Sequence, residues 1–284
     1  METTLLHTIA EVPDFGSEIN ENDFWTDEHI SEMILRQQLD PTYEGGSRLY
    51  SEILDTVDFI TTNIEMSRCK TLLDLGCGPG LYSSLLCKHV NNVIGIDISQ
   101  TSLNYALTKA KDEKLNIEYI LGNIIEIQNF PKAEIVLLIY SIFGSLSFEK
   151  RKELMVKINK CLPINGYFIF DVFSENAFHG QIDKRDWSIE EKGFWSPLSN
   201  LLLKQTIVNS VEMEILHRYI VIDESCKFKT FLFKEKYFKL LEINNFLNSF
   251  GFGIDLSLGS LTGKSISNTT KDIGIIARKF SNLS

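Results

Sequence analysis

The chain places an acidic residue and three glycines in one short turn. Asp74 lies in the apolar run 71–75, and Gly76, Gly78 and Gly80 follow at alternate positions. Glycines let the backbone turn sharply and let a ligand approach the main chain, and a helix that follows such a turn offers free N–H groups at its start. A dinucleotide site uses the same geometry to hold a pyrophosphate. The turn therefore predicts a nucleotide-binding site.

The acid that precedes the glycines indicates which nucleotide would bind. A carboxylate at Asp74 would repel a pyrophosphate and attract an amino group. A second apolar run, 92–97, ends in Asp97, whose carboxylate could accept hydrogen bonds from both hydroxyls of a ribose. S-adenosylmethionine carries an amino acid, a ribose and an adenine but no phosphate. The two acids therefore favour this cofactor over the nicotinamide of a dehydrogenase.

Strand and helix patterns alternate around this turn. Apolar runs predict strands at 71–75, 92–97, 116–121, 134–140 and 166–172. Helical spacing predicts helices at 27–38, 47–64, 79–89, 100–113 and 148–161. Such alternation is typical of an α/β fold with a doubly wound, Rossmann-like, mostly parallel sheet.

The pattern changes after residue 173. The β-type runs 201–210, 214–223 and 227–233 predict a small inserted antiparallel sheet, and helical spacing returns at 236–250. The runs 251–258 and 272–279 predict a closing pair, so that the last strand of the main sheet is antiparallel.

We expect three regions along the chain. Residues 1–65 would form an N-terminal helical cap, residues 66–173 and 235–284 the cofactor-binding domain, and residues 174–234 an inserted β lid over the substrate. The first twenty-three residues are acidic and polar, which is compatible with a loose segment or with one that folds over a ligand.

The sequence resembles the class I S-adenosylmethionine-dependent methyltransferases over roughly residues 47–173 and 236–279. The resemblance lies in four segments: 73–80 (LDLGCGPG), 93–99 (VIGIDIS), 121–124 (LGNI) and 162–167 (LPINGY). It implies that Asp74 and Gly76 hold the methionine end of S-adenosylmethionine and that Asp97 holds the ribose. It also implies that the other residues of the turn, Cys77, Gly78 and Gly80, bind the cofactor.

The resemblance also implies which residues contact the adenine and which part of the N-terminal segment covers the cofactor. Asn123 stands where the family usually has an aspartate that accepts a hydrogen bond from the adenine amino group, and its amide oxygen could accept the same bond. Ile98 would pack on the adenine face, and Ile124 could line the same slot. In related enzymes an N-terminal arginine pairs with the methionine carboxylate, a role open here to Arg48 or Arg36, each of which could equally be a solvated surface residue.

Methyl transfer is an in-line displacement that needs a base only when the acceptor arrives protonated. The catalytic candidates are Tyr140, Asp171 and His179. Tyr140 could face the methyl group or pack as a boundary aromatic, Asp171 could orient the acceptor or cap the next segment, and His179 could act as a base or be a loop histidine. His217, in the run 214–223, is expected to be structural.

Composition limits the class of partner. The chain of 284 residues has a formal net charge of −10, which argues against nucleic acid as a partner. Its longest apolar stretches, 135–146 and 166–173, are too short to span a bilayer. Five cysteines without a Cys-x-x-Cys pair indicate reduced thiols in a cytoplasmic protein, and no Cys/His group has the spacing of a metal site.

The sequence thus predicts a methyltransferase that acts on N or O of a small molecule, because an enclosing β insertion suits a small acceptor. The residues 139–145, which follow the fourth strand, lack the Asn-Pro-Pro-Tyr-like signature of amide and nucleobase N-methyltransferases. A protein or peptide acceptor, and a non-catalytic S-adenosylmethionine-binding protein, remain the alternatives. Exposed aromatics on the insertion could mediate a homodimer.

Overall fold

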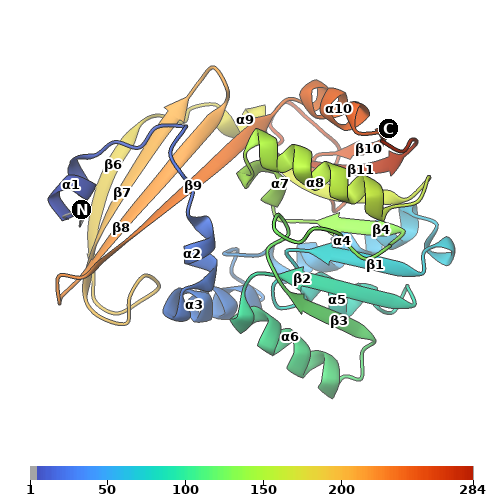
Figure 1. Ribbon diagram of the computed structural model, residues 1–284, viewed down its shortest axis with the longest axis horizontal. Helices are drawn as coiled ribbons and strands as arrows, with labels where there is room; N and C mark the ends of the chain where they lie inside the picture. The colour runs from blue at the N-terminus through green and yellow to red at the C-terminus, as the bar shows by residue number, and fades with distance from the viewer. Residues whose placement is uncertain (1–4, 284) are drawn as a thin grey trace.

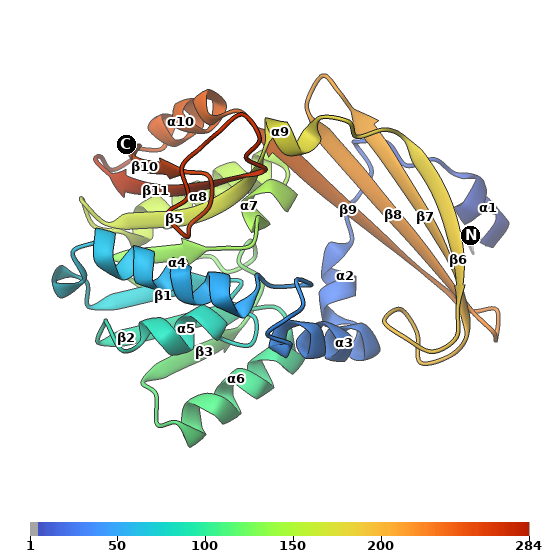
Figure 2. The same ribbon diagram turned by 180° about the vertical axis from the view of Figure 1, so that it is seen from behind.

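A computed structural model describes residues 5–283 of the chain. One continuous sheet of eleven strands runs through the molecule in the order β3-β2-β1-β4-β5-β9-β8-β7-β6, with β11 beside β5 and β10 beside β11. Figures 1 and 2 show that its two ends look different: one is a layered body with helices on both faces, and the other is a curved sheet of long strands standing beside it.

The layered body is the predicted Rossmann-like unit. Its parallel strands are β1 (Thr71–Leu75), β2 (Asn92–Asp97), β3 (Ile117–Leu121), β4 (Ile135–Leu138) and β5 (Tyr167–Ser174). The sheet closes with β10 (Phe252–Leu258) and β11 (Asp272–Lys279), and β11 runs antiparallel to β5. The prediction of a mostly parallel sheet with an antiparallel last strand is therefore confirmed.

Helices cover both faces of this body. One face carries α8 (Phe148–Cys161) and α10 (Leu240–Ser249), and the other carries α4 (Tyr50–Asn63) and α5 (Leu81–Leu86). The remaining helices of the body are α6 (Gln100–Asp112), the short α7 (Ile142–Ser145) and α9 (Glu175–Phe178), and the 3-10 turn Met66–Arg68. Successive side chains of a strand point to opposite faces of the sheet, so alternate residues of these strands pack into the two apolar layers.

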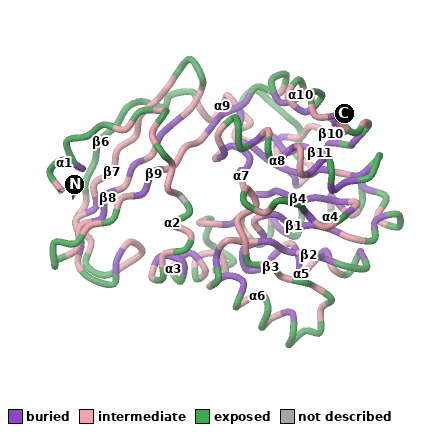
Figure 3. The backbone as a smooth tube through the Cα atoms, in the orientation of Figure 1, coloured by how far each residue is buried: buried purple, intermediate pink, exposed green. Residues whose placement is uncertain are grey.

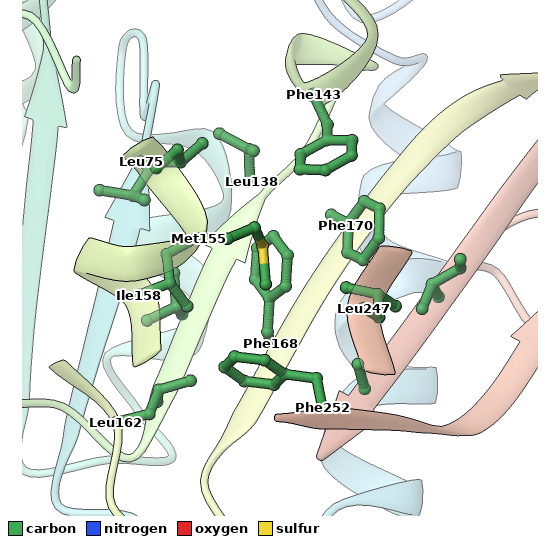
Figure 4. Packing of buried hydrophobic residues seen from close by; sticks show 14 of the residues in the cluster. Leu75, Leu138, Phe143, Met155, Ile158, Leu162, Phe168, Phe170, Leu247 and Phe252 are labelled. Carbon is green, nitrogen blue, oxygen red and sulfur yellow. The ribbon is translucent and has the colours of Figure 1, made fainter. Parts of the chain in front are cut away.

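Aromatic packing fixes the middle of the sheet. The rings of Phe168 and Phe170, on the same face of β5, stack with centroids 4.5 Å apart, and Phe143 lies 5.0 Å from Phe170. Figure 4 shows these rings packed against Met155 of α8 and Leu247 of α10. Strands β4 and β5 are buried along most of their length, and Figure 3 shows long buried stretches in the layered body. The carboxyl ends of β4 and β5 therefore project from a rigid core.

The curved end, which we call the lid sheet, is a four-stranded antiparallel sheet. Its strands are β6 (Lys184–Glu190), β7 (Asn200–Asn209), β8 (Glu214–Asp223) and β9 (Phe228–Phe238). Two features differ from the prediction. Strand β6 was missed, because its charged residues look like a loop, yet it pairs with β7 along its full length.

The second difference concerns the end of the lid sheet. The prediction that a helix begins at residue 236 was wrong, since β9 continues to Phe238 and α10 begins only at Leu240. Residues 228–236 pair with β8, and Tyr237 and Phe238 pair with Phe173 and Ser174 of β5. Pairing on both edges of the strand overrides its local helical spacing.

The N-terminal segment, residues 5–27, forms a strap around the lid sheet. Its helix α1 (Leu5–Ala10) lies on the outer face, where Arg218 donates hydrogen bonds to the carbonyl oxygens of Thr8 and Glu11. Asn20 then binds the free edge of β9: its side chain donates to the Thr230 carbonyl at 2.7 Å and accepts from the Leu232 N–H at 2.7 Å. Helices α2 (Glu21–Thr26) and α3 (Glu28–Leu39) follow on the inner face.

Replacing Asn20 by alanine should loosen the strap. Two hydrogen bonds to the edge of β9 would be lost, at about 1 kcal/mol each. We expect faster hydrogen exchange of the backbone amides in residues 5–27 and an unchanged affinity for S-adenosylhomocysteine. Replacing the exposed Asn22 by alanine is the matched control, and equal exchange in the two variants would contradict this role for Asn20.

Candidate functional site

A cavity of about 670 Å³ lies between the carboxyl ends of the parallel strands and the inner face of the lid sheet. This volume is within the range of small-molecule sites. The parallel sheet contributes Gly76, Gly78, Asp97, Ile98, Asn123, Ile124, Tyr140 and Ser141. The N-terminal region contributes Phe24, Trp25, Gln38, Gly46 and Arg48. The lid side contributes Phe194, Trp195, His217, Tyr219, Phe233 and Glu235.

The glycine turn forms the floor of the cavity. Gly76, Gly78 and Gly80 have φ values of +70°, +52° and +76°, which favour glycine. A Cβ atom at Gly80 would lie 2.2 Å from the hydroxyl oxygen of Tyr119, so this position cannot carry a side chain without displacing the tyrosine. Gly76 and Gly78 line the cavity, whereas Gly80 and the buried Cys77 lie beneath it. Burial raises the pKa of the Cys77 thiol, as expected of a packing residue.

Asp97 holds the turn in place from the neighbouring strand. One carboxylate oxygen accepts a hydrogen bond from the Gly78 N–H at 2.7 Å, and the other accepts from the Ser99 N–H at 2.7 Å. Burial raises the pKa of the carboxyl group, against these hydrogen bonds, which lower it. Each oxygen retains a further lone pair, so contact with a ribose, as predicted, is compatible with this geometry.

Asp74 lies behind the turn and not among the residues that line the cavity. Its side chain is 3% exposed and accepts a hydrogen bond of 2.6 Å from the Ser83 hydroxyl of α5. Burial, with a smaller contribution from the charge of Asp97, raises the pKa of this carboxyl group to about 6. The predicted contact with the methionine amino group stays a prediction, and in this geometry Asp74 connects β1 to α5.

The residues predicted for the adenine side come together at one end of the cavity. Ile98 follows β2, and Asn123 and Ile124 follow β3. The amide oxygen of Asn123 accepts a hydrogen bond from the Ile125 N–H at 2.9 Å, and its amide nitrogen donates to Glu126 at 2.9 Å. These bonds fix the amide at the turn after β3. Its predicted bond to adenine would use the second lone pair of the oxygen.

Tyr140 and Ser141 stand at the carboxyl end of β4 in left-handed conformations, with φ values of 75° and 57°. Such backbone conformations are uncommon for non-glycine residues and cluster at functional sites. The hydroxyl oxygen of Tyr140 accepts a hydrogen bond from the Gly46 N–H at 3.1 Å, and the Arg48 guanidinium carbon lies 5.5 Å from the centre of the ring. Tyr140 therefore fastens the loop before α4 over the cavity.

Replacing Tyr140 by phenylalanine should weaken this attachment modestly. The loss of one hydrogen bond is worth about 1 kcal/mol, or roughly fivefold in an equilibrium constant. We expect the dissociation constant for S-adenosylhomocysteine, measured by calorimetry, to rise by that factor. A rise of several hundredfold would instead indicate that the hydroxyl contacts the ligand directly. Replacing Tyr167, which lies outside the cavity, by phenylalanine is the control.

Arg48 and Asp171 belong to a partly buried ion-pair cluster beside the cavity. The Arg48 guanidinium lies 2.8 Å from Asp171, 3.1 Å from Asp272 and 3.2 Å from Glu44. Burial alone would lower the pKa of Arg48, but the two aspartates outweigh it and raise it. The guanidinium is thus already matched by carboxylates, and its predicted contact with the methionine carboxylate stays a prediction.

Asp171 does not line the main cavity, and both of its oxygens have partners. One oxygen accepts a hydrogen bond from the Ser141 N–H at 3.0 Å and the other binds Arg48. The residue borders a separate, more polar cavity of about 410 Å³. Of the two roles that the sequence left open, the geometry favours a structural one, in which Asp171 fixes Ser141 and Arg48.

His179 is the third catalytic candidate, which the sequence left open as a base or a loop histidine. It is exposed at the end of α9 and does not line the cavity. Arg36 is also exposed and outside the cavity. The short helix α9 turns the chain away from the cavity before β6 begins, so the structure gives no support for His179 as a base.

Two cavity residues that sequence reasoning missed have buried polar atoms without a hydrogen-bond partner. They are the amide oxygen of Gln38 and the hydroxyl of Ser141. Buried polar atoms are nearly always bonded, so these two are candidate ligand contacts. Together with Asp97 for a diol and the apolar Ile98, they suit a nucleoside that carries an amino-acid group. The residues present therefore fit S-adenosylmethionine.

The lid side of the cavity carries a wall of aromatic rings. The rings of Trp195 and Tyr219 stack at 4.7 Å, and Phe24 of the strap contacts Phe233 at 5.0 Å. Strand pairing brings a titratable pair to the same wall, His217 on β8 and Glu235 on β9, with a nitrogen-to-oxygen distance of 3.6 Å. Nothing in the sequence indicates that His217 lines the cavity, because only the register of β8 and β9 shows which side it faces.

Other kinds of site find no support in the part of the chain that the structure describes. Residues 5–283 contain no group of three or more His, Cys, Asp or Glu side chains that could hold a metal ion. The five cysteines are all free. None of the described helices is long and apolar enough to cross a membrane.

Comparison with known proteins adds independent support. Residues 72–166 match a family model described as a methyltransferase domain. A protein of Geobacillus sp. (strain WCH70) that carries the name of a methyltransferase is 25% identical over 256 residues, which cover 84% of this chain and 100% of the relative.

Solved methyltransferases share the fold. The CcbJ methyltransferase from Streptomyces caelestis superposes with a TM-score of 0.66 at 14% identity, covering 89% of this chain and 98% of its own. CalS10, an amino pentose methyltransferase from Micromonospora echinaspora with S-adenosylmethionine bound, superposes with a TM-score of 0.53 at 15% identity, covering 82% and 93%. Residues 72–166 therefore form a methyltransferase domain, and the chain has the fold of solved S-adenosylmethionine-dependent methyltransferases.

Proposed function

We propose that the enzyme methylates a nitrogen or oxygen atom of a small-molecule acceptor held between the cofactor loops and the lid sheet. The observation that carries this proposal is the cavity of about 670 Å³, which has the glycine turn on one side and the aromatic wall on the other. A cavity of this size with an aromatic wall suits a metabolite or a natural-product intermediate better than a folded protein surface.

The chain's own residues would bind and orient the two reactants. S-adenosylmethionine, when bound, supplies an electrophilic methyl group on a sulfonium. Asp97 and the glycine turn would hold its ribose and amino-acid ends, with Gln38 and Ser141 as further polar contacts. The aromatic wall would exclude water and hold the acceptor in line with the methyl group. Alignment of this kind can contribute about 7–11 kcal/mol in the best intramolecular models.

The likeness to CalS10 is compatible with this proposal, since its name describes an amino pentose as acceptor. At 15% identity this likeness concerns the fold, and fold alone does not determine the acceptor. The identity of the acceptor must therefore come from a direct measurement.

The experiment is labelled methyl transfer into a fractionated cell lysate. The enzyme is incubated with methyl-labelled S-adenosylmethionine and either the small-molecule fraction or the protein fraction, and the label and S-adenosylhomocysteine are measured. We expect label in small molecules only, and none with the Asp97→Ala variant. Label in the protein fraction alone would reject the proposal in favour of a protein or peptide acceptor.

We further propose that three regions of the chain have different roles. Residues 66–173 and 235–284 would bind the cofactor, residues 174–234 would cover the acceptor, and residues 1–65 would cap both. Most of the residues assigned above to the cofactor fall in the first of these regions, while the aromatic wall comes from the other two. The five free cysteines support a cytoplasmic location.

A homodimer through the lid sheet remains our proposal for the oligomeric state. Strand β6 is an edge strand on which Trp187 is 65% exposed and Ile189 is 74% exposed. Exposed apolar residues on an edge strand favour association. Light scattering should give the mass of a dimer, and Trp187→Glu should give a monomer; a monomeric wild-type enzyme would refute this.

A further inference from the structure

His217 and Glu235 stand together on the inner face of the lid sheet and face the cavity. The Nε2 atom of His217 lies 3.6 Å from the Oε2 atom of Glu235, and its Nδ1 atom lies 3.4 Å from the Thr206 hydroxyl. The Tyr237 hydroxyl donates a hydrogen bond of 2.8 Å to Glu235. Each member of the pair is thus oriented by a second side chain, an arrangement typical of groups that handle protons.

The pair lies near the junction of the lid with the parallel sheet. Tyr237 pairs with Phe173 at the end of β5, and the two rings stack at 5.5 Å. Glu235 is two residues before Tyr237 on the same strand, so both side chains are on the same face, about 7 Å apart along the strand. Phe173 also lines the cavity, as does Tyr140 at the end of β4. The pair therefore borders the same space as the residues that would surround the methyl group.

The charges around the cavity leave Glu235 available for a cationic ligand. Arg48 is matched by its three carboxylates, and the ammonium of Lys234 lies 2.8 Å from Glu214. Burial alone would raise the pKa of Glu235, but hydrogen bonds from His217 and Tyr237, and the positive charge that His217 carries once it is protonated, outweigh burial and lower it. The ring faces of the aromatic wall are a second feature that attracts cations.

We propose, on the basis of the function inferred above, that Glu235 binds the protonated amine of the acceptor and that His217 accepts its proton. An amine brings one N–H proton to the neutral imidazole of His217, which becomes an imidazolium. The freed lone pair of the nitrogen then forms a bond to the methyl carbon as the carbon–sulfur bond breaks, and the bonding electrons leave with sulfur as a neutral thioether. The product is the methylated ammonium. Glu235 stabilises both the incoming ammonium and the imidazolium.

Binding of a probe amine tests the role of Glu235. The enzyme loaded with S-adenosylhomocysteine is titrated with benzylamine and with benzyl alcohol at pH 7 and followed by tryptophan fluorescence. We expect benzylamine to bind at least about tenfold more tightly than the alcohol, and Glu235→Gln to remove that preference. Equal binding of the two probes, binding of neither, or an unchanged preference in Glu235→Gln would overturn the amine assignment.

Turnover tests the role of His217. S-adenosylhomocysteine formation is measured with a panel of primary and secondary amines, and the best acceptor is used for the variants. We expect His217→Asn to lower kcat by about 100-fold with little change in KM, as for loss of a general base. The exposed His179 supplies the matched control, His179→Asn, which should keep wild-type kcat. A His217→Asn variant within threefold of wild type, or a panel in which no amine is methylated, would overturn the proton-acceptor role.

The affinity for S-adenosylhomocysteine separates this inference from the proposed function. Both variants should bind S-adenosylhomocysteine as wild type does, which also shows that they are folded. If wild type itself does not bind it, the proposed function fails. If binding is intact and label enters only hydroxyl compounds, the proposed function stands and the amine inference fails.

Discussion

Replacing Asp97 by alanine should weaken the binding of S-adenosylhomocysteine by at least about 100-fold. The carboxylate accepts two short backbone hydrogen bonds, from Gly78 and Ser99, and hydrogen bonds to a charged group are worth about 1.5–3 kcal/mol each. Its removal would release the glycine turn and also delete the predicted ribose contact. Calorimetric titration measures the change, with labelled methyl transfer as a second readout.

The control for Asp97 is Asp112→Ala, an exposed aspartate at the end of α6. This variant should bind as wild type does. A thermal melt without ligand shows whether the Asp97 variant is folded. Binding of the folded Asp97→Ala variant within threefold of wild type would contradict the assignment of this crevice to the cofactor.

Replacing Asp74 by asparagine should make the protein more stable and its cofactor binding weaker. The folded-state pKa of about 6 lies above the ordinary value of 3.8, so the folded protein binds a proton that the unfolded chain has released. Ionised Asp74 therefore destabilises the fold above pH 6, and the cost disappears as the pH falls through 6 towards 4. At 1.36 kcal/mol per pKa unit, asparagine should raise the free energy of unfolding at pH 8 by about 2–3 kcal/mol.

Denaturant unfolding at pH 8 and pH 4 checks this prediction, since the gain from Asp74→Asn should be large at the higher pH and near zero at the lower. Affinity for the cationic cofactor should fall because a nearby negative charge is removed. Ser83→Ala is the matched control: it removes the hydrogen bond to the ionised carboxylate and should lower stability at pH 8. If Asp74→Asn raised the free energy of unfolding equally at both pH values, burial of the ionised carboxylate would not be what destabilises the fold.

The cofactor side of the site was predictable because its signals are local. A buried strand, an acid, a glycine turn and a helix are contiguous at residues 71–86, and the next strand ends in Asp97. Carboxyl ends of parallel strands meet at one edge of a sheet, so contiguity in sequence was enough to place Asp97, Ile98 and Asn123 together.

The acceptor side was not predictable in the same way. His217 and Glu235 lie on different strands, and whether they share the cavity face depends on the register, since a shift of one strand by one residue would turn its side chain away. Gln38 reaches the glycine turn from α3 only through tertiary packing. Asp171 is the opposite case: a carboxylate at the end of a parallel strand is a catalytic candidate by sequence, and the structure adds an arginine and a backbone amide as its partners.

The path of β9 constrains how ligands reach the interior. This one strand is hydrogen-bonded to β8 at residues 228–236 and to β5 at residues 237 and 238. It therefore joins the lid sheet directly to the parallel sheet. A rigid rotation of the lid sheet away from the parallel sheet would bend β9 or break its hydrogen bonds to β5. The strap is attached to the free edge of β9 through the side chain of Asn20, and peeling it away costs far fewer hydrogen bonds. The rate at which ligands enter and leave should therefore depend on the strap, and removing the strap should speed ligand exchange and make the cavity less selective for its acceptor.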